Sequence, residues 1–277
     1  MKRRRIQEQA KFWRDPNFEH LEILHATYLT HSFAPHSHGY FVTSIVDRGA
    51  GSIWYRGANH VAPAGSLVLL NPDEMHTGQV LGEEGWSYRA LYPGMDLLSH
   101  VTLALTEQSW NTYLYLLPNP IIYDTKLASL LHRLHSVLEE GTSMLERESW
   151  LLQTYTYLLT RYAEHPPMLR PISKEPQAVR KAREYIEAHY AENLSLSELA
   201  QVSGLTSYHL VHVFHQALGL PPHAYLNQIR LTHAKNLLLA GMPIAMVAYE
   251  TGFADQSHLT KRLKRIYGVT PGQIVRH

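Results

Sequence analysis

The C-terminal third of the chain contains one pattern of apolar residues and glycines twice. The first part repeats at an offset of 48 residues, where Leu199, Ala200, Gly204 and Leu205 match Val247, Ala248, Gly252 and Phe253. The second part repeats at an offset of 49 residues, where Leu210, Phe214, Gly219 and Pro222 match Leu259, Leu263, Gly268 and Pro271. Apolar residues at helical spacing that are broken by glycine predict two short helices and a turn in each copy. This part of the chain must therefore fold as two similar helical units.

The second helix of the later copy has one side suited to packing and one basic side. Asp255 is a good N-cap for it, and at about 100° per residue Leu259, Leu263 and Ile266 fall together on one side. The opposite side carries Ser257, His258, Lys261, Lys264 and Arg265. A DNA major groove admits such a helix, and Lys and Arg suit guanine or phosphate. A solvated basic face on an ordinary helix is the alternative; the second copy favours DNA reading, because two units can contact two successive groove faces.

Residues from about 176 to 276 resemble the DNA-binding domain of AraC/XylS-type transcription regulators. The run GFADQSHLTKRLKRIYGVTPGQI from Gly252 to Ile274 is similar to the family signature, although the family usually has an aromatic residue where Leu259 and Leu263 stand. The resemblance implies helix-turn-helix units at about 196–218 and about 244–267. A long helix at 222–240, with Arg230, Ala234 and Leu238, would join them. The DNA-binding domain would cover 177–277 and follow a proline-rich linker at 166–176.

The resemblance places the contacts with double-stranded promoter or operator DNA on the second helix of each unit. In the later unit the expected residues are Gln256, Ser257, His258, Lys261, Arg262, Lys264 and Arg265. In the first unit they are Ser207, Tyr208, His209, His212, His215 and Gln216, which include no Lys or Arg. This face can read bases with neutral donors and acceptors, it can mainly position the other unit, or its histidines can bind a metal. If these histidines lie near phosphates, DNA affinity should strengthen as the pH falls through about 6.5.

Charge and composition agree with a DNA-binding C-terminal half. Residues 174–277 carry a net charge of +4 and residues 1–173 a net charge of −3, so affinity has to come from local placement of charge. The chain has no cysteine, which excludes disulfides and thiol catalysis. No apolar run is long enough for a membrane span, and the N-terminus lacks a signal core. We expect a cytoplasmic protein without a membrane partner. The basic cluster Lys2–Arg5 is either a solubilising terminus or a tail that contacts DNA.

Short strand-like runs between turn signals fill residues 18–92 and predict a small sandwich or barrel. His36 and His38, followed by Gly57 and the Pro63–Gly65 turn, resemble the two motifs of a cupin jelly roll. The positions where a metal-binding cupin has a glutamate and a further histidine hold Phe41 or Val42, and Val68. We therefore predict no metal, no cofactor and no catalytic residue. A divalent-metal cupin enzyme that uses His36, His38 and His76, with the C-terminal half as a regulatory module, is the alternative.

The same region resembles the sensor barrel of AraC-type regulators, which implies a small-molecule effector bound within residues 1–93. By position, the expected effector-binding residues are His36, His38, Tyr40, Asn71, Glu74, His76, Trp86, Tyr88 and Arg89. Trp86, Tyr88 and Tyr92 alternate on one face of their strand, so either they or Arg89 face inward. Aromatic and histidine-rich walls suit a sugar, an amino acid or an aromatic compound about equally well.

Helical periodicity returns after Tyr92 and defines an extension at 94–165. Asp124 is expected to cap a helix to about Glu140 with a leucine stripe, and a second helix is expected from Glu146 to Glu164. Such stripes are usually core, but the resemblance implies a homodimer through residues 124–164. The predicted fold is therefore multidomain, with a cupin-like β-barrel, dimerisation-type helices and an all-α domain. The predicted function is an effector-controlled, sequence-specific transcription regulator, with RNA polymerase as a further partner.

Overall fold

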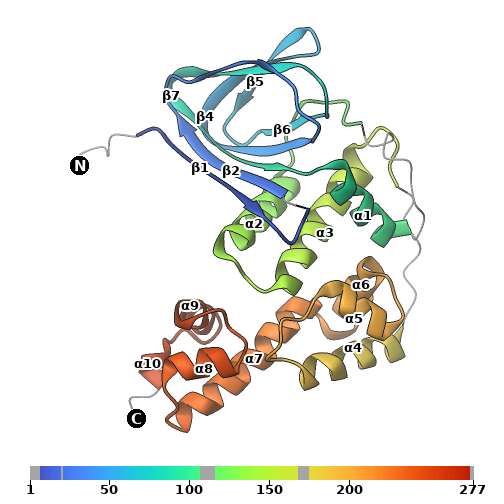
Figure 1. Ribbon diagram of the computed structural model, residues 1–277, viewed down its shortest axis with the longest axis vertical. Coiled ribbons are helices and arrows are strands. Elements are labelled where there is room, and N and C mark those ends of the chain that lie inside the picture. Colours follow the sequence, from blue (N-terminus) through green and yellow to red (C-terminus); the bar gives the residue numbers. More distant parts are fainter. Residues whose placement is uncertain (1–6, 20, 107–115, 168–174, 275–277) are drawn as a thin grey trace. The chain divides into compact units, whose positions relative to one another are not determined.

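The computed structural model describes residues 7–19, 21–106, 116–167 and 175–274, so the basic cluster at 2–5 and most of the expected linker at 166–176 lie outside the described residues. The chain divides into two compact units (Figure 1). Unit 1 contains residues up to 139 together with 150–169, and unit 2 contains residues 140–149 and those from 170 onward. Within the part of the chain that the structure describes, no helix is both long and apolar enough to cross a membrane.

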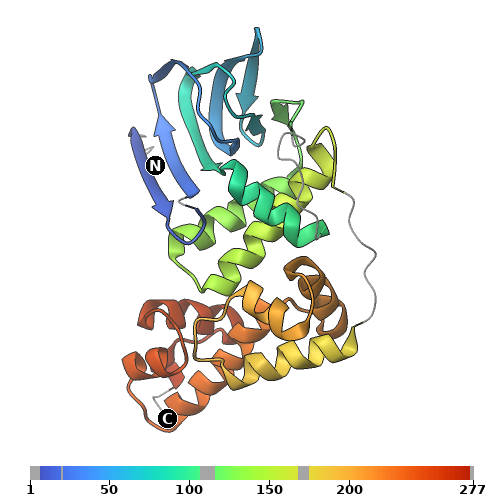
Figure 2. The ribbon, with the colours of Figure 1, turned by 45° about the vertical axis from the view of Figure 1, so that its right-hand side comes forward.

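Unit 1 is built on one curled, eight-stranded antiparallel sheet (Figures 1 and 2). Its strands are β1 (Gln9–Asp15), β2 (Leu21–Tyr28), β3 (Ser32–His36), β4 (Val42–Tyr55), β5 (Ala58–Pro63), β6 (Leu67–Leu70), β7 (His76–Tyr92) and β8 (Ile121–Ile122). The sheet order is β1-β2-β7-β4-β6-β8, while β3 pairs with β7 and β5 pairs with β4. The long strands β4 and β7 bend at register shifts, which let one strand take part in several pairings. The predicted cupin-like β domain is confirmed.

The helices of unit 1 cover the outer side of this sheet. They are α1 (Met95–Thr106), α2 (Thr125–Glu140) and α3 (Met144–Tyr162), whose first residues up to 149 group with unit 2. Asp124 caps α2 as predicted, because its Oδ1 accepts from the backbone N of Lys126 at 2.8 Å and of Leu127 at 3.0 Å. The leucine stripe of α2 is buried, and the buried Tyr155 hydroxyl of α3 is hydrogen-bonded to Thr43 of β4 at 3.0 Å. The apolar faces of these helices therefore serve the core of the chain's own fold.

Unit 2 consists of helices and shows the sequence repeat directly. Its elements are α4 (Pro176–Ala188), α5 (Leu196–Ser203), α6 (Ser207–Leu218), α7 (Pro222–Leu239), α8 (Ile244–Glu250), α9 (Gln256–Tyr267) and α10 (Pro271–Ile274). Gly204 lies directly after α5 and Gly252 lies two residues after α8, and both have a left-handed backbone, with φ of 72° and 73°. The backbone N–H of each glycine donates to the carbonyl oxygen three residues earlier, at 3.2 Å for Gly204 and 3.1 Å for Gly252. The side chains of Thr206 and Asp255 then cap the N-termini of α6 and α9. Each accepts a hydrogen bond from the backbone N–H three residues later in the chain. The two copies are thus two helix-turn-helix units of the same local design.

The long helix α7 runs between the two helix-turn-helix units and contributes to both (Figure 1). On one side its Arg230 is fully buried, and donates from Nε to Tyr190 O and from Nη2 to Glu192 O, both at 2.7 Å. Burial lowers the pKa of this guanidinium to about 10, so it stays charged at neutral pH. Leu231, Ala234 and Leu238 of α7 pack in one apolar cluster with residues of α8 and α9. This cluster includes Leu259 and Leu263, whereas Ile266 is 53% exposed because the packed part of α9 ends before its last turn.

Candidate effector pocket and DNA-reading helices

The sheet of unit 1 contains a cavity of about 460 Å³. This size is within the range of small-molecule sites, which are typically 300–1,000 Å³. Its aromatic lining includes Phe12, Tyr28, Phe33, Trp86, Tyr88 and Tyr92. Trp86, Tyr88 and Tyr92 face inward together because they alternate along β7, as the period of two predicts.

Six of the nine residues predicted to bind an effector line this cavity. They are His36, His38, Tyr40, His76, Trp86 and Tyr88. Tyr28 and Phe33 were not in the predicted set, although they line the cavity and their rings meet edge to face at 5.5 Å. The sequence could have predicted the inward direction of Tyr28, because this residue follows Leu24 and Ala26 at the period of two along β2. Phe33 lies on a strand with a register shift, so its inward direction could not be read from alternation.

The other three predicted residues, Asn71, Glu74 and Arg89, do not line the cavity. Asn71 is fully buried and serves as a structural link, since it donates to Leu117 O at 3.1 Å and accepts from Leu117 N at 2.9 Å. Glu74 pairs with Arg56, which lowers the pKa of its carboxyl. Arg89 lies on the other face of β7 and donates to Asp47 at 3.0 Å. Each of these side chains is held by a partner that lies outside the cavity lining.

Trp86 brings a buried indole N–H to the wall of the cavity. It is 5% exposed, and no residue that the structure describes gives its buried indole Nε1 a hydrogen-bond partner. Its ring lies against two glycines, since a Cβ at Gly51 would be 2.4 Å from Trp86 Cε2 and one at Gly78 would be 3.4 Å from Trp86 Cζ3. A buried donor without an acceptor costs about 1–3 kcal/mol.

The described lining of the cavity holds no Asp, Glu, Lys or Arg, so its polar side-chain groups are hydroxyls, imidazoles and the Trp86 indole. Desolvation raises the pKa of Tyr88 and Tyr92, which keeps both hydroxyls protonated. Desolvation lowers the pKa of His38 and His76, which favours their neutral rings. The cavity is therefore an aromatic space with neutral polar groups.

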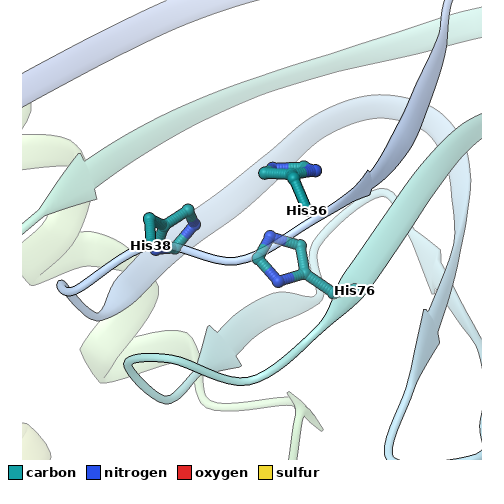
Figure 3. A group of neighbouring side chains, drawn as sticks. All are labelled: His36, His38 and His76. Carbon is teal, nitrogen blue, oxygen red and sulfur yellow. The ribbon is translucent and has the colours of Figure 1, made fainter.

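The three histidines of the cavity lie together, as Figure 3 shows. His36 and His76 are direct partners in the antiparallel register of β3 and β7, and their ring centroids are 4.4 Å apart. The His38 ring lies 4.8 Å from that of His76 and 5.8 Å from that of His36. One nitrogen from each ring lies within 4.8 Å of the other two, which is close enough to be considered as a metal site.

Helix α9 presents most of its predicted DNA-contacting residues to solvent. Gln256, Ser257, Lys261, Lys264 and Arg265 are exposed. His258 is partly buried against Phe253, with ring centroids 5.5 Å apart, and burial lowers its pKa. Arg262 donates from Nε to His258 Nε2 at 3.2 Å, and its Nη2 donates to Glu146, a 1% exposed carboxylate within the segment 140–149 of unit 2. The exposed surface of α9 is therefore basic, with Lys261, Lys264 and Arg265 as its cations.

Comparison with known families decides what these two units are. Residues 20–154 match the AraC-like ligand binding domain, and residues 199–277 match a helix-turn-helix domain. The chain belongs to the AraC family of transcription regulators. As an AraC-family regulator it binds DNA through its C-terminal domain and carries a ligand-binding domain ahead of it.

Two relatives of this AraC-family regulator match over most of their length. An uncharacterised HTH-type transcriptional regulator of Bacillus subtilis, YbfI, is 28% identical over 245 residues, which cover 88% of this chain and 87% of the relative. The arabinose operon regulatory protein of Escherichia coli is 25% identical over 249 residues, covering 84% of this chain and 79% of that protein. Among solved structures, ToxT from Vibrio cholerae with a bound unsaturated fatty acid is 14% identical, covers 97% of this chain and 94% of that one, and gives a TM-score of 0.37. The curated relatives named here are regulators of transcription.

The first helix-turn-helix unit of this AraC-family regulator exposes a different surface. His215 and Gln216 of α6 are exposed, whereas Ser207, His209 and His212 are partly buried. Tyr208 is 8% exposed, and its ring lies 4.1 Å from that of His212. The Nδ1 of His212 donates to the backbone O of Tyr208 at 2.9 Å. The six predicted residues of α6 thus form a neutral surface in which two aromatic rings support each other.

Proposed function

We propose that this regulator reads its operator with α6 and α9, and that the two helices make different kinds of contact with the DNA. The basic surface of α9, with Lys261, Lys264 and Arg265, supplies phosphate contacts and donors to guanine. The neutral surface of α6 supplies base contacts through His215, Gln216 and the partly buried residues beside them. The observation that supports this division is the contrast between two helices of the same local design, one with three exposed cations and one with none among its predicted contacts.

The effector proposed here is an aromatic or otherwise flat apolar compound with one hydrogen-bond acceptor. The aromatic lining favours a flat body, and the hydroxyls and imidazoles of the lining can donate to the acceptor. A free amino acid fits less well, since the described lining offers no acidic side chain for its ammonium group. Binding would control transcription if the effector has different affinities for two presentations of the DNA-binding domain.

We propose two further partners by analogy with the family. A second copy of the chain, through the outward faces of residues 124–164, would place two pairs of reading helices on a repeated operator. RNA polymerase is the further partner of a protein that regulates from a promoter, and the cytoplasm is the compartment where both occur. The cavity is assigned to binding and not to catalysis, because the relatives that match over most of the chain regulate transcription.

The experiment that tests DNA reading uses the full-length protein. Labelled DNA from upstream of its own gene is mixed with excess random DNA at two salt concentrations, because phosphate contacts alone weaken steeply with salt. A complex that survives both competitor and higher salt supports sequence-specific binding by this protein. Loss of the complex in competitor, both with and without candidate effectors, would overturn the proposal.

The effector is sought with the same protein by indole fluorescence. Flat aromatic compounds with one acceptor should quench the part of the emission that Trp86→Phe removes. Trp54→Phe is the matched control, since that side chain is 40% exposed and does not line the cavity. Quenching that persists in Trp86→Phe but not in Trp54→Phe would place the compound elsewhere and contradict the proposal.

A further inference from the structure

We propose that His36, His38 and His76 bind one divalent transition-metal ion of the Zn²⁺ type through their Nε2 atoms, at the polar side of the effector cavity. The proposal concerns the same cavity as the proposed function, but it does not depend on what the C-terminal domain binds. It also identifies the polar partner that an effector would meet in an otherwise aromatic space.

The fold explains why three separate histidines meet. His36 ends β3 and His76 begins β7, and the antiparallel register makes them direct partners. Directly opposite residues of an antiparallel pair have Cβ atoms about 4.5–5.5 Å apart on the same face. His38 follows His36 by two residues in the segment that leaves β3, and its ring returns to within 4.8 Å of the His76 ring. All three residues line the cavity, and Figure 3 shows their rings close to one another.

The hydrogen bonds of the three rings select the nitrogen that would bind a metal. The Nδ1 of His36 bonds to Ala34 O at 2.8 Å, that of His38 to Tyr40 O at 3.0 Å, and that of His76 to Glu74 O at 2.9 Å. A carbonyl only accepts, so each Nδ1 carries the proton and each neutral ring keeps the lone pair on Nε2. Metal-binding histidines in proteins are oriented in this way, by donating the other ring N–H to a carbonyl or carboxylate. The same bond at three neighbouring rings is therefore an observation independent of their closeness.

The distances require only a small closing movement. One nitrogen of each ring lies within 4.8 Å of one nitrogen of the other two, whereas nitrogens on one tetrahedral Zn²⁺ lie about 3.3 Å apart, since each Zn–N bond is about 2.0–2.1 Å. His36 is exposed and lies beyond a register shift of β3, so its ring can turn toward the buried His76 without disturbing a core. His76 and His38 would then define the site, and His36 would complete it.

The composition of the set selects the metal. It contains imidazoles alone, because the positions where a metal-binding cupin has its glutamate and its further histidine hold the buried residues Phe41 or Val42, and Val68. Imidazole suits Zn²⁺, Cu²⁺, Ni²⁺ and Fe²⁺, whereas Mg²⁺ and Ca²⁺ prefer oxygen ligands. Three neutral ligands leave the full double charge of the ion and an open fourth position, as in catalytic zinc sites. In this cavity that position would favour an anionic oxygen, so the effector would combine an acidic head with an aromatic body.

The test uses untagged, full-length protein that has been stripped with a chelator and dialysed. Zn²⁺ is titrated in by calorimetry, and Co²⁺ is added in parallel to follow its visible absorption. We expect one equivalent of Zn²⁺, a rise in the melting temperature of unit 1, and no equivalent effect of Mg²⁺. His76→Ala and the smaller change His76→Gln should each weaken Zn²⁺ binding by at least about 100-fold, since even partners of metal ligands are worth 10–100-fold.

Two matched controls separate this site from the other histidines of the chain. His31→Ala removes a ring that stacks on Tyr28 but is not part of the histidine set, and it should leave Zn²⁺ binding unchanged. His212→Ala tests the histidines of α6 and should also leave it unchanged. Absence of stoichiometric binding, or binding that survives both His76 variants while they keep wild-type circular dichroism, would overturn the inference. A protein that binds its operator but no metal would do the same and leave the regulator assignment intact.

Discussion

The Arg230 guanidinium and the backbone of Gly252 occupy adjoining space in unit 2. A Cβ at Gly252 would lie 2.9 Å from Arg230 Nη2 and 2.5 Å from Ala191 O. Arg230 itself is bonded to the backbone oxygens of Tyr190 and Glu192, on either side of Ala191. The turn of the second helix-turn-helix unit therefore touches the segment that precedes the first. Besides α7, this contact fixes the spacing between the two reading helices.

Gly252→Ala should destabilise unit 2 more than Gly204→Ala. Both glycines have the same left-handed conformation, which costs an alanine about 1–2 kcal/mol. A Cβ at Gly204 would meet nothing within 4 Å, whereas one at Gly252 overlaps backbone, which adds about 1–3 kcal/mol. Urea unfolding of the two variants measures the difference. Equal losses would show that the contact with Ala191 and Arg230 relaxes freely.

Leu263→Asp and Ile266→Asp should differ strongly in their effect on the free energy of unfolding. Leu263 is 0% exposed within the cluster formed with α7 and α8, so a carboxylate there is buried without a partner. We expect a loss on the order of 4 kcal/mol or more, against roughly 0.5 kcal/mol for the 53% exposed Ile266. Chemical denaturation followed by circular dichroism provides the measurement. A large loss in Ile266→Asp would mean that this residue packs after all.

Lys261→Ala and Arg265→Ala should each weaken binding to the operator. If the side chain contacts a base edge, the loss is about 1–3 kcal/mol and is confined to certain sequences. If it contacts a phosphate, the loss is the same for all sequences, and the slope of the binding constant against salt concentration falls by about 1. Lys181→Ala, which removes an exposed charge from α4, is the control. Titrations against operator and random DNA distinguish these results. Unchanged affinity in both α9 variants would exclude this surface as the reader.

Acid should destabilise unit 1 through His135. The 1% exposed ring donates from Nε2 to Leu24 O at 3.2 Å and accepts at Nδ1 from Arg89 at 3.3 Å, an arrangement that only the neutral ring can make. Burial, with Arg89 beside it, lowers its pKa to about 4 in the folded state, below the ordinary 6.5 of the unfolded chain. The unfolded chain therefore binds more protons between these values. The stabilisation is complete above about pH 6.5 and is lost as the pH falls toward 4.

The measurement compares wild type with His135→Gln by urea unfolding at pH 7.5 and pH 5. The wild type should lose on the order of 2 kcal/mol more than the variant between these conditions, since one pKa unit is worth about 1.4 kcal/mol. Identical pH dependence of the two proteins would show that His135 does not titrate as its burial implies.

The sequence predicted those features that depend on local pattern. The repeat around Gly204 and Gly252, the N-caps Asp124 and Asp255 and the alternation of Trp86 and Tyr88 follow from nearest neighbours, and the structure has each of them. Asn71 and Arg89 could not be placed, because their partners Leu117 and Asp47 are 46 and 42 residues away in the chain. The pairing of His36 with His76 likewise depends on the register of β3 against β7, which a strand with a shift does not reveal in advance.

The two glycines beneath Trp86 determine how much room the cavity has. A Cβ at Gly51 would overlap the indole, and one at Gly78 would press on both Phe33 and the indole, so either would change the wall of the cavity. The absence of side chains at these two glycines therefore helps to set the size of effector that the cavity can hold. A regulator of this kind could shift its preference toward a smaller inducer through one added methyl group on β4, without changing any residue that contacts DNA.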